Sequence, residues 1–168
     1  MTEVVGARRT TQTMRCFTYY LVAPAAGVST VAITAGSNWF IMFCGALFFT
    51  GVDQVSPIDA SANADQPIAA STFSANITTV ANNAWIIDNV GVNPNTALTQ
   101  GTGQTKPQSG NNSNNAWATS YKGPVSPAGV TAMNWTNAGN VQWDWGAISL
   151  TPAAGGTTVK QLAALGVG

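Results

Sequence analysis

Short runs of strand-forming residues separated by turn-forming residues make up most of this chain. Val, Ile, Thr, Phe, Tyr and Trp recur in the runs, whereas Gly, Pro and Asn gather between them, which is typical of β-strands joined by turns. Turn signals recur roughly every ten residues, as in antiparallel sandwiches and barrels. The pattern therefore predicts an all-β fold with strands near residues 13–22, 28–35, 40–50, 71–79, 84–92, 98–105, 114–122, 129–136 and 142–151.

Residues 19–34 predict two strands joined by a tight turn. Pro24 has a fixed φ, and Gly27 permits the φ values that a tight connection needs. After the turn, side chains alternate between two faces, which places Val31 and Ile33 on the same, inward face. We therefore expect a hairpin that buries these two side chains.

The run from Phe40 to Phe49 is apolar on both faces. Such a run is typical of a strand that is covered on both sides. We predict that it is the central strand of the sandwich, with Phe43, Leu47 and Phe49 in the core. Coverage by a loop or by a neighbouring subunit is the alternative interpretation.

Two polar segments lack the strand pattern. Residues 51–70 contain Pro57 and Pro67 and are predicted to form a loop that crosses from one sheet to the other. Residues 101–115 are rich in Gly and Asn and have little apolar area to bury, so we expect an exposed surface loop. Such a loop either contacts a ligand or is a solvated hairpin tip.

The sequence predicts one sandwich domain, residues 10–152, between two short terminal segments. Residues 1–9 are predicted to form an N-terminal arm. The basic cluster Arg8, Arg9 and Arg15 at this end of the chain either contacts a phosphate or an acidic partner or belongs to a solvated arm. Residues 153–168 form a C-terminal tail after a Pro-Ala-Ala-Gly-Gly break. Its apolar residues fit one face of a short helix that docks on the sandwich or on a partner: Val159, Leu162, Ala163 and Leu165.

Composition narrows the classes of partner. The 168 residues suffice for one hydrophobic core, and 45% of them are hydrophobic. Charged residues make up 7%, six basic and six acidic, against roughly 25% in ordinary soluble domains. Without clustered Lys and Arg the chain is not expected to bind nucleic acid. A nearly neutral surface also lacks self-repulsion, which favours assembly or an extracellular setting.

Candidate catalytic and metal-binding chemistry is sparse. Histidine is absent, which excludes His-dependent enzymes, and no nucleophile or phosphate-loop motif occurs, so we expect no enzymatic activity. Asp53, Asp59 and Asp65 lie at six-residue spacing, where carboxylates act as acid and base or hold Ca²⁺. The alternative is that Asp53 and Asp59 bond to their own turns. No other cofactor is expected.

Tryptophan is the other candidate for ligand binding. Trp143 and Trp145 share one strand face, and two exposed rings there would form a stacking platform for sugar rings. Asn114, in the Asn-rich segment, and Trp117, just after it, extend this candidate carbohydrate site. The alternative is that Trp135 and Trp145 fill the core. The six tryptophans lie at positions 39, 85, 117, 135, 143 and 145.

The cysteines bear on whether a disulfide forms, and the longest apolar run bears on membrane insertion. Cys16 and Cys44 lie in different apolar segments, so their spacing does not establish whether they pair, and we favour buried free thiols. The apolar run at residues 39–49 is about eleven residues long, whereas a membrane helix needs roughly 20. No membrane insertion is therefore expected.

Three motifs carry a resemblance to a known module. They are the Tyr-Leu-x-x-Pro-x-x-Gly turn, the Thr-Gly-Val-Asp-Gln…Pro-Ile-Asp-Ala crossover and the closing Trp-Gly-Ala-Ile-Ser-Leu-Thr-Pro strand, within residues 10–151. In these the chain resembles a jelly-roll module of bacterial secreted and phage-encoded proteins. The resemblance implies a lectin-like antiparallel jelly-roll β-sandwich and no particular activity, since similar modules occur in virion fibres, adhesins and carbohydrate-binding appendages.

One departure from that module bears on assembly. Similar modules have one or two further strands before the position matching Thr10, so either residues 2–7 form a short first strand or a neighbouring subunit supplies one. The leading hypothesis is a non-enzymatic structural protein that associates with copies of itself or with other subunits, on a virion surface or in an extracellular filament. The second hypothesis is a carbohydrate-binding module that holds glycans on exposed Trp residues.

Overall fold

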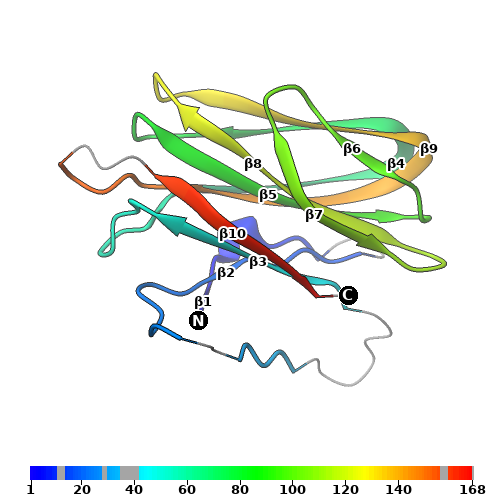
Figure 1. The fold of residues 1–168 in the computed structure, drawn as a ribbon. Helices are drawn as coiled ribbons and strands as arrows, with labels where there is room; N and C mark the ends of the chain where they lie inside the picture. Colours follow the sequence, from blue (N-terminus) through cyan, green and yellow to red (C-terminus); the bar gives the residue numbers. More distant parts are fainter. Residues whose placement is uncertain (11–13, 28–29, 35–41, 156–158, 168) are drawn as a thin grey trace.

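The computed structural model describes residues 1–10, 14–27, 30–34, 42–155 and 159–167, and β-strands make up most of it (Figure 1). One short 3-10 helix, η1 (Val5–Ala7), follows the first strand. The prediction of an all-β fold with antiparallel pairing is confirmed. The strands are β1 (Thr2–Glu3), β2 (Tyr19–Tyr20), β3 (Cys44–Thr50), β4 (Ile58–Thr78), β5 (Ala84–Asn93), β6 (Leu98–Gln100), β7 (Thr105–Asn111), β8 (Ala116–Val125), β9 (Val130–Leu150) and β10 (Lys160–Val167).

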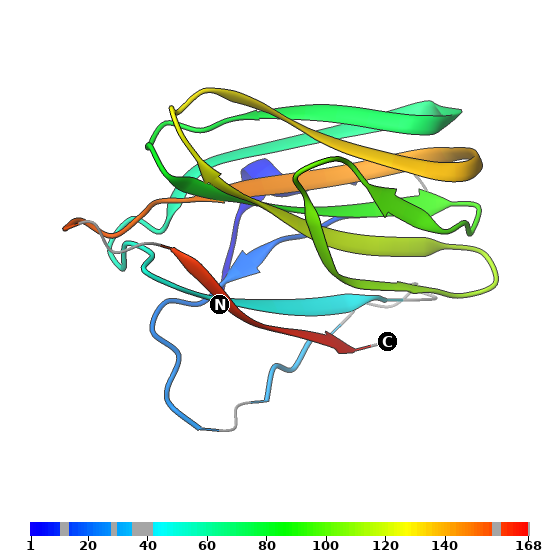
Figure 2. The ribbon, with the colours of Figure 1, turned by 45° about the horizontal axis from the view of Figure 1, so that its top comes forward.

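The two longest strands, β4 and β9, bend so that each contributes to two layers (Figures 1 and 2). They pair antiparallel with register irregularities between Gln66 and Thr72, and such irregularities bend a strand. The first part of β9 pairs with β6, and its second part pairs with β5, which continues to β8 and β7. The sheet therefore folds over on itself into an upper and a middle layer. This arrangement is sandwich-like, and the jelly-roll topology stays a prediction.

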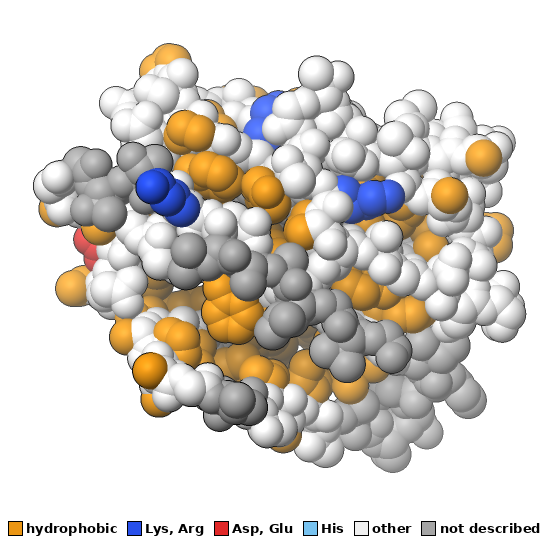
Figure 3. Space-filling model, viewed as in Figure 1, with side chains coloured by type: hydrophobic (Ala, Val, Ile, Leu, Met, Phe, Trp, Pro, Cys, Tyr) orange, Lys and Arg blue, Asp and Glu red, His pale blue; other side chains and the backbone are white. Residues whose placement is uncertain are grey.

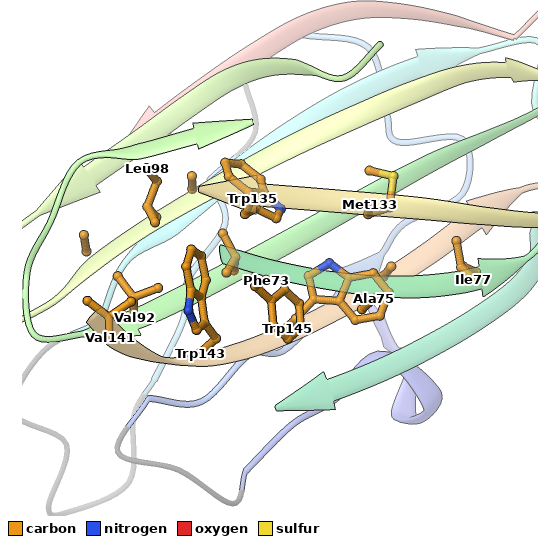
Figure 4. Close-up of a cluster of buried hydrophobic side chains, with 14 of the residues drawn as sticks. Phe73, Ala75, Ile77, Val92, Leu98, Met133, Trp135, Val141, Trp143 and Trp145 are labelled. Atoms are coloured by element: carbon orange, nitrogen blue, oxygen red, sulfur yellow. The ribbon is translucent and has the colours of Figure 1, made fainter. Parts of the chain in front are cut away.

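The main hydrophobic core lies between these two layers (Figure 4). Trp135, Trp143 and Trp145 are fully buried in it, and the ring of Phe73 stacks on Trp143 with centroids 5.6 Å apart. Burial of such large aromatic side chains supplies much of the hydrophobic stabilisation of a fold. The aromatic and β-branched residues that predicted strands here are therefore also the residues that hold the layers together.

A second core lies between the middle layer and the chain termini. Val4 and Ala7 pack there with Ile148, Leu150 and Val159. Residues 1–9 and 153–168, expected to be an arm and a tail, thus contribute buried side chains to the folded body. Beyond them, β3 and β10 form a two-stranded sheet that covers part of β7 and β8.

The interpretation of residues 40–50 as the central strand is wrong. Among the described residues β3 pairs with β10 alone. Phe43, Leu47 and Phe49 are half-buried, and Phe48 is 40% exposed. One face of β3 packs on the aromatic rings of the middle layer, where Phe43 stacks on Trp117, and the other faces outward. Apolar residues on both faces of this strand therefore did not mean that described residues bury both faces. Cover of the outward face by a neighbouring subunit stays a prediction.

The hairpin predicted for residues 19–34 also differs from the structure. β2 spans two residues and pairs with β1, and Thr30–Thr34 is not part of a strand. Val31 and Ile33, expected to point inward, are 55% and 50% exposed. Residues 28, 29 and 35 of the predicted second strand lie outside the described residues.

Three further segments predicted as loop or helix are strands. Much of residues 51–70 belongs to β4, and Thr105–Asn111 is β7. Both strands lie at the ends of the strand order, and Pro67 and Pro107 fall at register irregularities, where proline costs no ladder hydrogen bond. The tail pairs with β3 as β10 instead of forming a helix, because a short isolated helix is marginal and an open strand edge offers partners for its backbone.

Candidate functional site

The tryptophans proposed as a sugar-stacking platform are not available at the surface. Trp143 and Trp145 are fully buried, and Trp117 is 8% exposed beneath Phe43. The alternative, that Trp135 and Trp145 fill the core, is confirmed. Asn114 is exposed, but its backbone is held in a turn by the Asn112 side chain. The observation on which the carbohydrate-binding hypothesis depended is therefore missing from this structure.

The three aspartates proposed as calcium ligands or an acid–base pair have separate structural partners. Asp53 accepts hydrogen bonds from the backbone of Val55 and Ser56 at 2.8 Å, which lower the pKa of its carboxyl, so its predicted turn role is confirmed. Asp59 accepts from the backbone of a different turn, at residues 80–81, and Asp65 forms an ion pair with Arg9. Within the described ranges no cluster of three metal-ligating side chains occurs.

A buried polar network centred on Asp88 was missed by the sequence reasoning. Its Oδ2 accepts hydrogen bonds from the indole N–H groups of Trp135 at 2.8 Å and Trp145 at 2.9 Å. Its Oδ1 accepts from the backbone and the hydroxyl of Ser120, and Gln104 Nε2 donates to that hydroxyl at 2.8 Å. Burial raises the pKa of the Asp88 carboxyl, and these donated hydrogen bonds oppose the shift.

This network ties the layers together and is not a reaction centre. Gln104 Oε1 accepts from the backbone of Asn134 in the upper layer, so the chain of bonds runs from β9 through Gln104 and Ser120 to Asp88 in the middle layer. Asp88 is 1% exposed and Ser120 is fully buried, so no substrate reaches them. The signal was present in the sequence, because alternation along β5 places Asp88 on the same face as Ile86 and Val90.

The two cysteines are free thiols in different surroundings. Cys16 is buried, as expected, and Cys44 is only partly buried. Burial raises the pKa of the Cys16 thiol well above its ordinary value, the nearby negative charge of Asp144 adds to this, and a backbone hydrogen bond from Gly91 opposes it. Because the thiolate is the reactive form, Cys16 is an inert core residue.

We predict that a thiol reagent at pH 8 will modify Cys44 and leave Cys16 unmodified in the folded protein. The partial exposure of Cys44 gives the reagent access, whereas burial denies both access and ionisation at Cys16. Mass spectrometry should find one label per chain, and two after unfolding. The Cys44→Ser variant, as the control, should take no label until it unfolds, and rapid labelling of that variant would contradict the burial of Cys16.

An exposed apolar surface is the feature that remains without a structural role. It involves described residues from Phe17 to β3. The described part of 21–34, which we call the apolar loop, stands off from the sandwich (Figures 1 and 2). Figure 3 shows hydrophobic side chains gathered around a hollow on this part of the molecule. The exposed apolar residues from this stretch are Phe17, Tyr19, Leu21, Val31, Ile33, Met42 and Phe48.

The apolar surface is also uncharged. No Lys, Arg, Asp or Glu occurs between Arg15 and Asp53. Contiguous exposed apolar area on a protein commonly marks a site of association, and the lack of charge leaves an ionic ligand nothing to bind. This surface is therefore the candidate functional site, and its chemistry suits a protein partner.

Comparison with protein-family models, with characterised proteins and with solved structures finds no match to this chain. The resemblance to jelly-roll modules thus stays a prediction from its motifs. The described residues contain no helix with the length and apolar character needed to cross a membrane.

Proposed function

We propose that the protein is a non-enzymatic structural subunit that associates with copies of itself. The observation that carries the proposal is the exposed, uncharged apolar surface between β2 and β3, where Leu21, Val31 and Phe48 are among the exposed side chains. Covering such area is favourable at about 25 cal/mol per Å² of apolar surface. The sequence motifs favour a virion surface or an extracellular filament as the setting of this subunit.

The character of the remaining residues supports a structural role. The chain has no histidine, and the candidate aspartates Asp53, Asp59 and Asp65 are each engaged in turns or an ion pair. Net charge is zero, so two copies approach without repulsion from their overall charge. Association through apolar contacts is therefore the function that these features favour.

The proposal predicts that Phe48→Asp weakens self-association strongly. Phe48 points outward from β3, and a carboxylate at that position would have to be desolvated in the interface. Sedimentation of the parent protein should give a multiple of 17.3 kDa at micromolar concentration, nearly independent of salt because the surface is uncharged. The variant should shift toward the monomer with an unchanged circular dichroism spectrum.

Val130→Asp is the matched control, since Val130 is an exposed apolar residue at the start of β9, outside the apolar surface. It should leave association unchanged. A parent protein that stays monomeric at micromolar concentration would overturn the proposed function, and equal weakening by both variants would show that the apolar surface is not the contact.

A further inference from the structure

Thr30–Thr34 has the sequence of a β-strand but no strand partner among the described residues of the chain. Its residues alternate Thr-Val-Ala-Ile-Thr, a pattern with high strand propensity. Its backbone makes no hydrogen bond to another described residue, and Val31 and Ile33 are exposed. A segment of this kind is suited to pair with a sheet edge and bury one face as it does so.

β3 offers such an edge. It pairs on one side with β10, from Thr50 opposite Lys160 to Cys44 opposite Val167. No described strand pairs with its other side, and Gln108 Nε2 donates a hydrogen bond to the carbonyl of Ala46 at 3.0 Å. The edge of seven residues exceeds the length of Thr30–Thr34. An added strand that faces the Ala46 carbonyl would replace its bond from Gln108.

The single chain does not use this edge for its own segment. Although β3 is formed, Thr30–Thr34 lies in the apolar loop that stands off from the sandwich (Figures 1 and 2). Residues 35–41 connect the two in sequence, and seven residues span at most about 23 Å when extended. A connection of that length does not by itself hold the segment at the edge of its own β3.

We propose that Thr30–Thr34 of one copy adds as a strand to the open edge of β3 in a second copy, in a reciprocal exchange. This proposal rests on the self-association proposed above and names its contact. A two-fold exchange is self-complementary, because each copy donates one segment and accepts another. The uncharged stretch between Arg15 and Asp53 brings no like charges together at the contact.

The test uses two proline variants, Val31→Pro and Ala32→Pro. Successive N–H groups of a strand point to opposite sides, so one of the two substitutions removes a donor to β3 and blocks strand pairing. For that variant, sedimentation equilibrium should show a dissociation constant at least about 100-fold higher than that of the parent, since an added strand depends on its main-chain hydrogen bonds. Ala26→Pro, in the same exposed loop but outside the segment, is the control and should leave the constant unchanged. Folding of each variant is checked by circular dichroism.

Hydrogen exchange gives the second measurement on the parent protein. The amides of Thr30–Thr34 should be protected in the assembly and exchange rapidly after dilution to the monomer. A monomeric parent would overturn this proposal together with the proposed function. Assembly that survives both proline substitutions, or leaves these amides unprotected, would overturn the strand exchange alone.

Two other outcomes also decide against the exchange. Protection of the Thr30–Thr34 amides in the diluted monomer would show that the segment pairs within its own chain. Binding of the parent to neutral phosphatidylcholine vesicles that is lost in Val31→Pro, without self-association in solution, would show that the segment contacts lipid instead of a second copy.

Discussion

Replacing Asp88 by Ala is expected to destabilise the protein by about 3–5 kcal/mol, because several buried donors lose their acceptor at once. The substitution leaves the indole N–H groups of Trp135 and Trp145 and the backbone N–H of Ser120 without an acceptor. Each orphaned buried donor costs about 1–3 kcal/mol, and relief of the buried charge offsets part of the sum. Denaturant unfolding followed by circular dichroism measures the difference.

Ser120→Ala is the graded control for this prediction. It removes one hydrogen bond to Asp88 and leaves Gln104 Nε2 without its acceptor, so it should cost about 1–3 kcal/mol. If Asp88→Ala costs no more than Ser120→Ala, the four bonds to the carboxylate contribute less than their geometry indicates.

The pH dependence of stability follows from the same residue. Burial raises the pKa of the Asp88 carboxyl in the folded state above the unfolded value of 3.8. The folded protein therefore binds this proton more tightly, and the contribution of Asp88 to stability is greatest below the unfolded pKa and is lost as pH rises through the folded pKa. Asp88→Asn removes this contribution, so the stability of the parent minus that of the variant should fall over that interval.

The sequence predicted those strands in which burial against neighbouring strands agrees with the local pattern of apolar residues. The strand predicted at 84–92 corresponds to β5, and those at 129–136 and 142–151 both lie within β9. In β5 and β9 the inward positions hold Ile, Val, Trp and Met, so alternation, strand propensity and burial agree. The sequence did not show that β9 continues between the two predicted strands, because Asn137, Gly139 and Asn140 are turn-forming residues.

Elements that depend on a distant partner were not predictable in this way. The first half of β4 is polar and contains Pro67, yet it pairs with β9 from Ile58 to Gln66. Backbone hydrogen bonds to an existing strand override local propensity in such segments. The pairing of β10 with β3 has the same origin, since the two strands lie more than a hundred residues apart.

The sequence indicated the chemistry of the candidate site but not which residues form it. The low charge content of the whole chain favoured association, whereas alternation placed Val31 and Ile33 inward and both are exposed in the structure. Alternation identifies which side chains share a face, but whether that face is covered depends on a partner strand. For Trp143 and Trp145, the shared strand face was consistent with either an exposed platform or a buried core, and the structure buries it.

Replacing Trp143 by Ala is expected to cost about 3–5 kcal/mol, through lost burial and the cavity left between the layers. Trp143 is fully buried, stacks on Phe73 with an interplanar angle of 17°, and donates a hydrogen bond from Nε1 to the Ala70 carbonyl at 3.1 Å. The substitution removes all three contributions. Denaturant midpoints followed by far-ultraviolet circular dichroism, which does not depend on the lost indole, measure the effect.

Two further variants test whether the cost of Trp143→Ala comes from the core between the layers. Trp143→Phe keeps a ring against Phe73 while losing the bond to Ala70, so it should cost less than Trp143→Ala and still fold if the alanine variant does not. Phe48→Ala removes an aromatic side chain that is 40% exposed and should cost about 1 kcal/mol or less in the monomer, because most of its surface change involves solvent. Equal costs for Trp143→Ala and Phe48→Ala would show that β3, and not the paired layers of β4 and β9, carries the core.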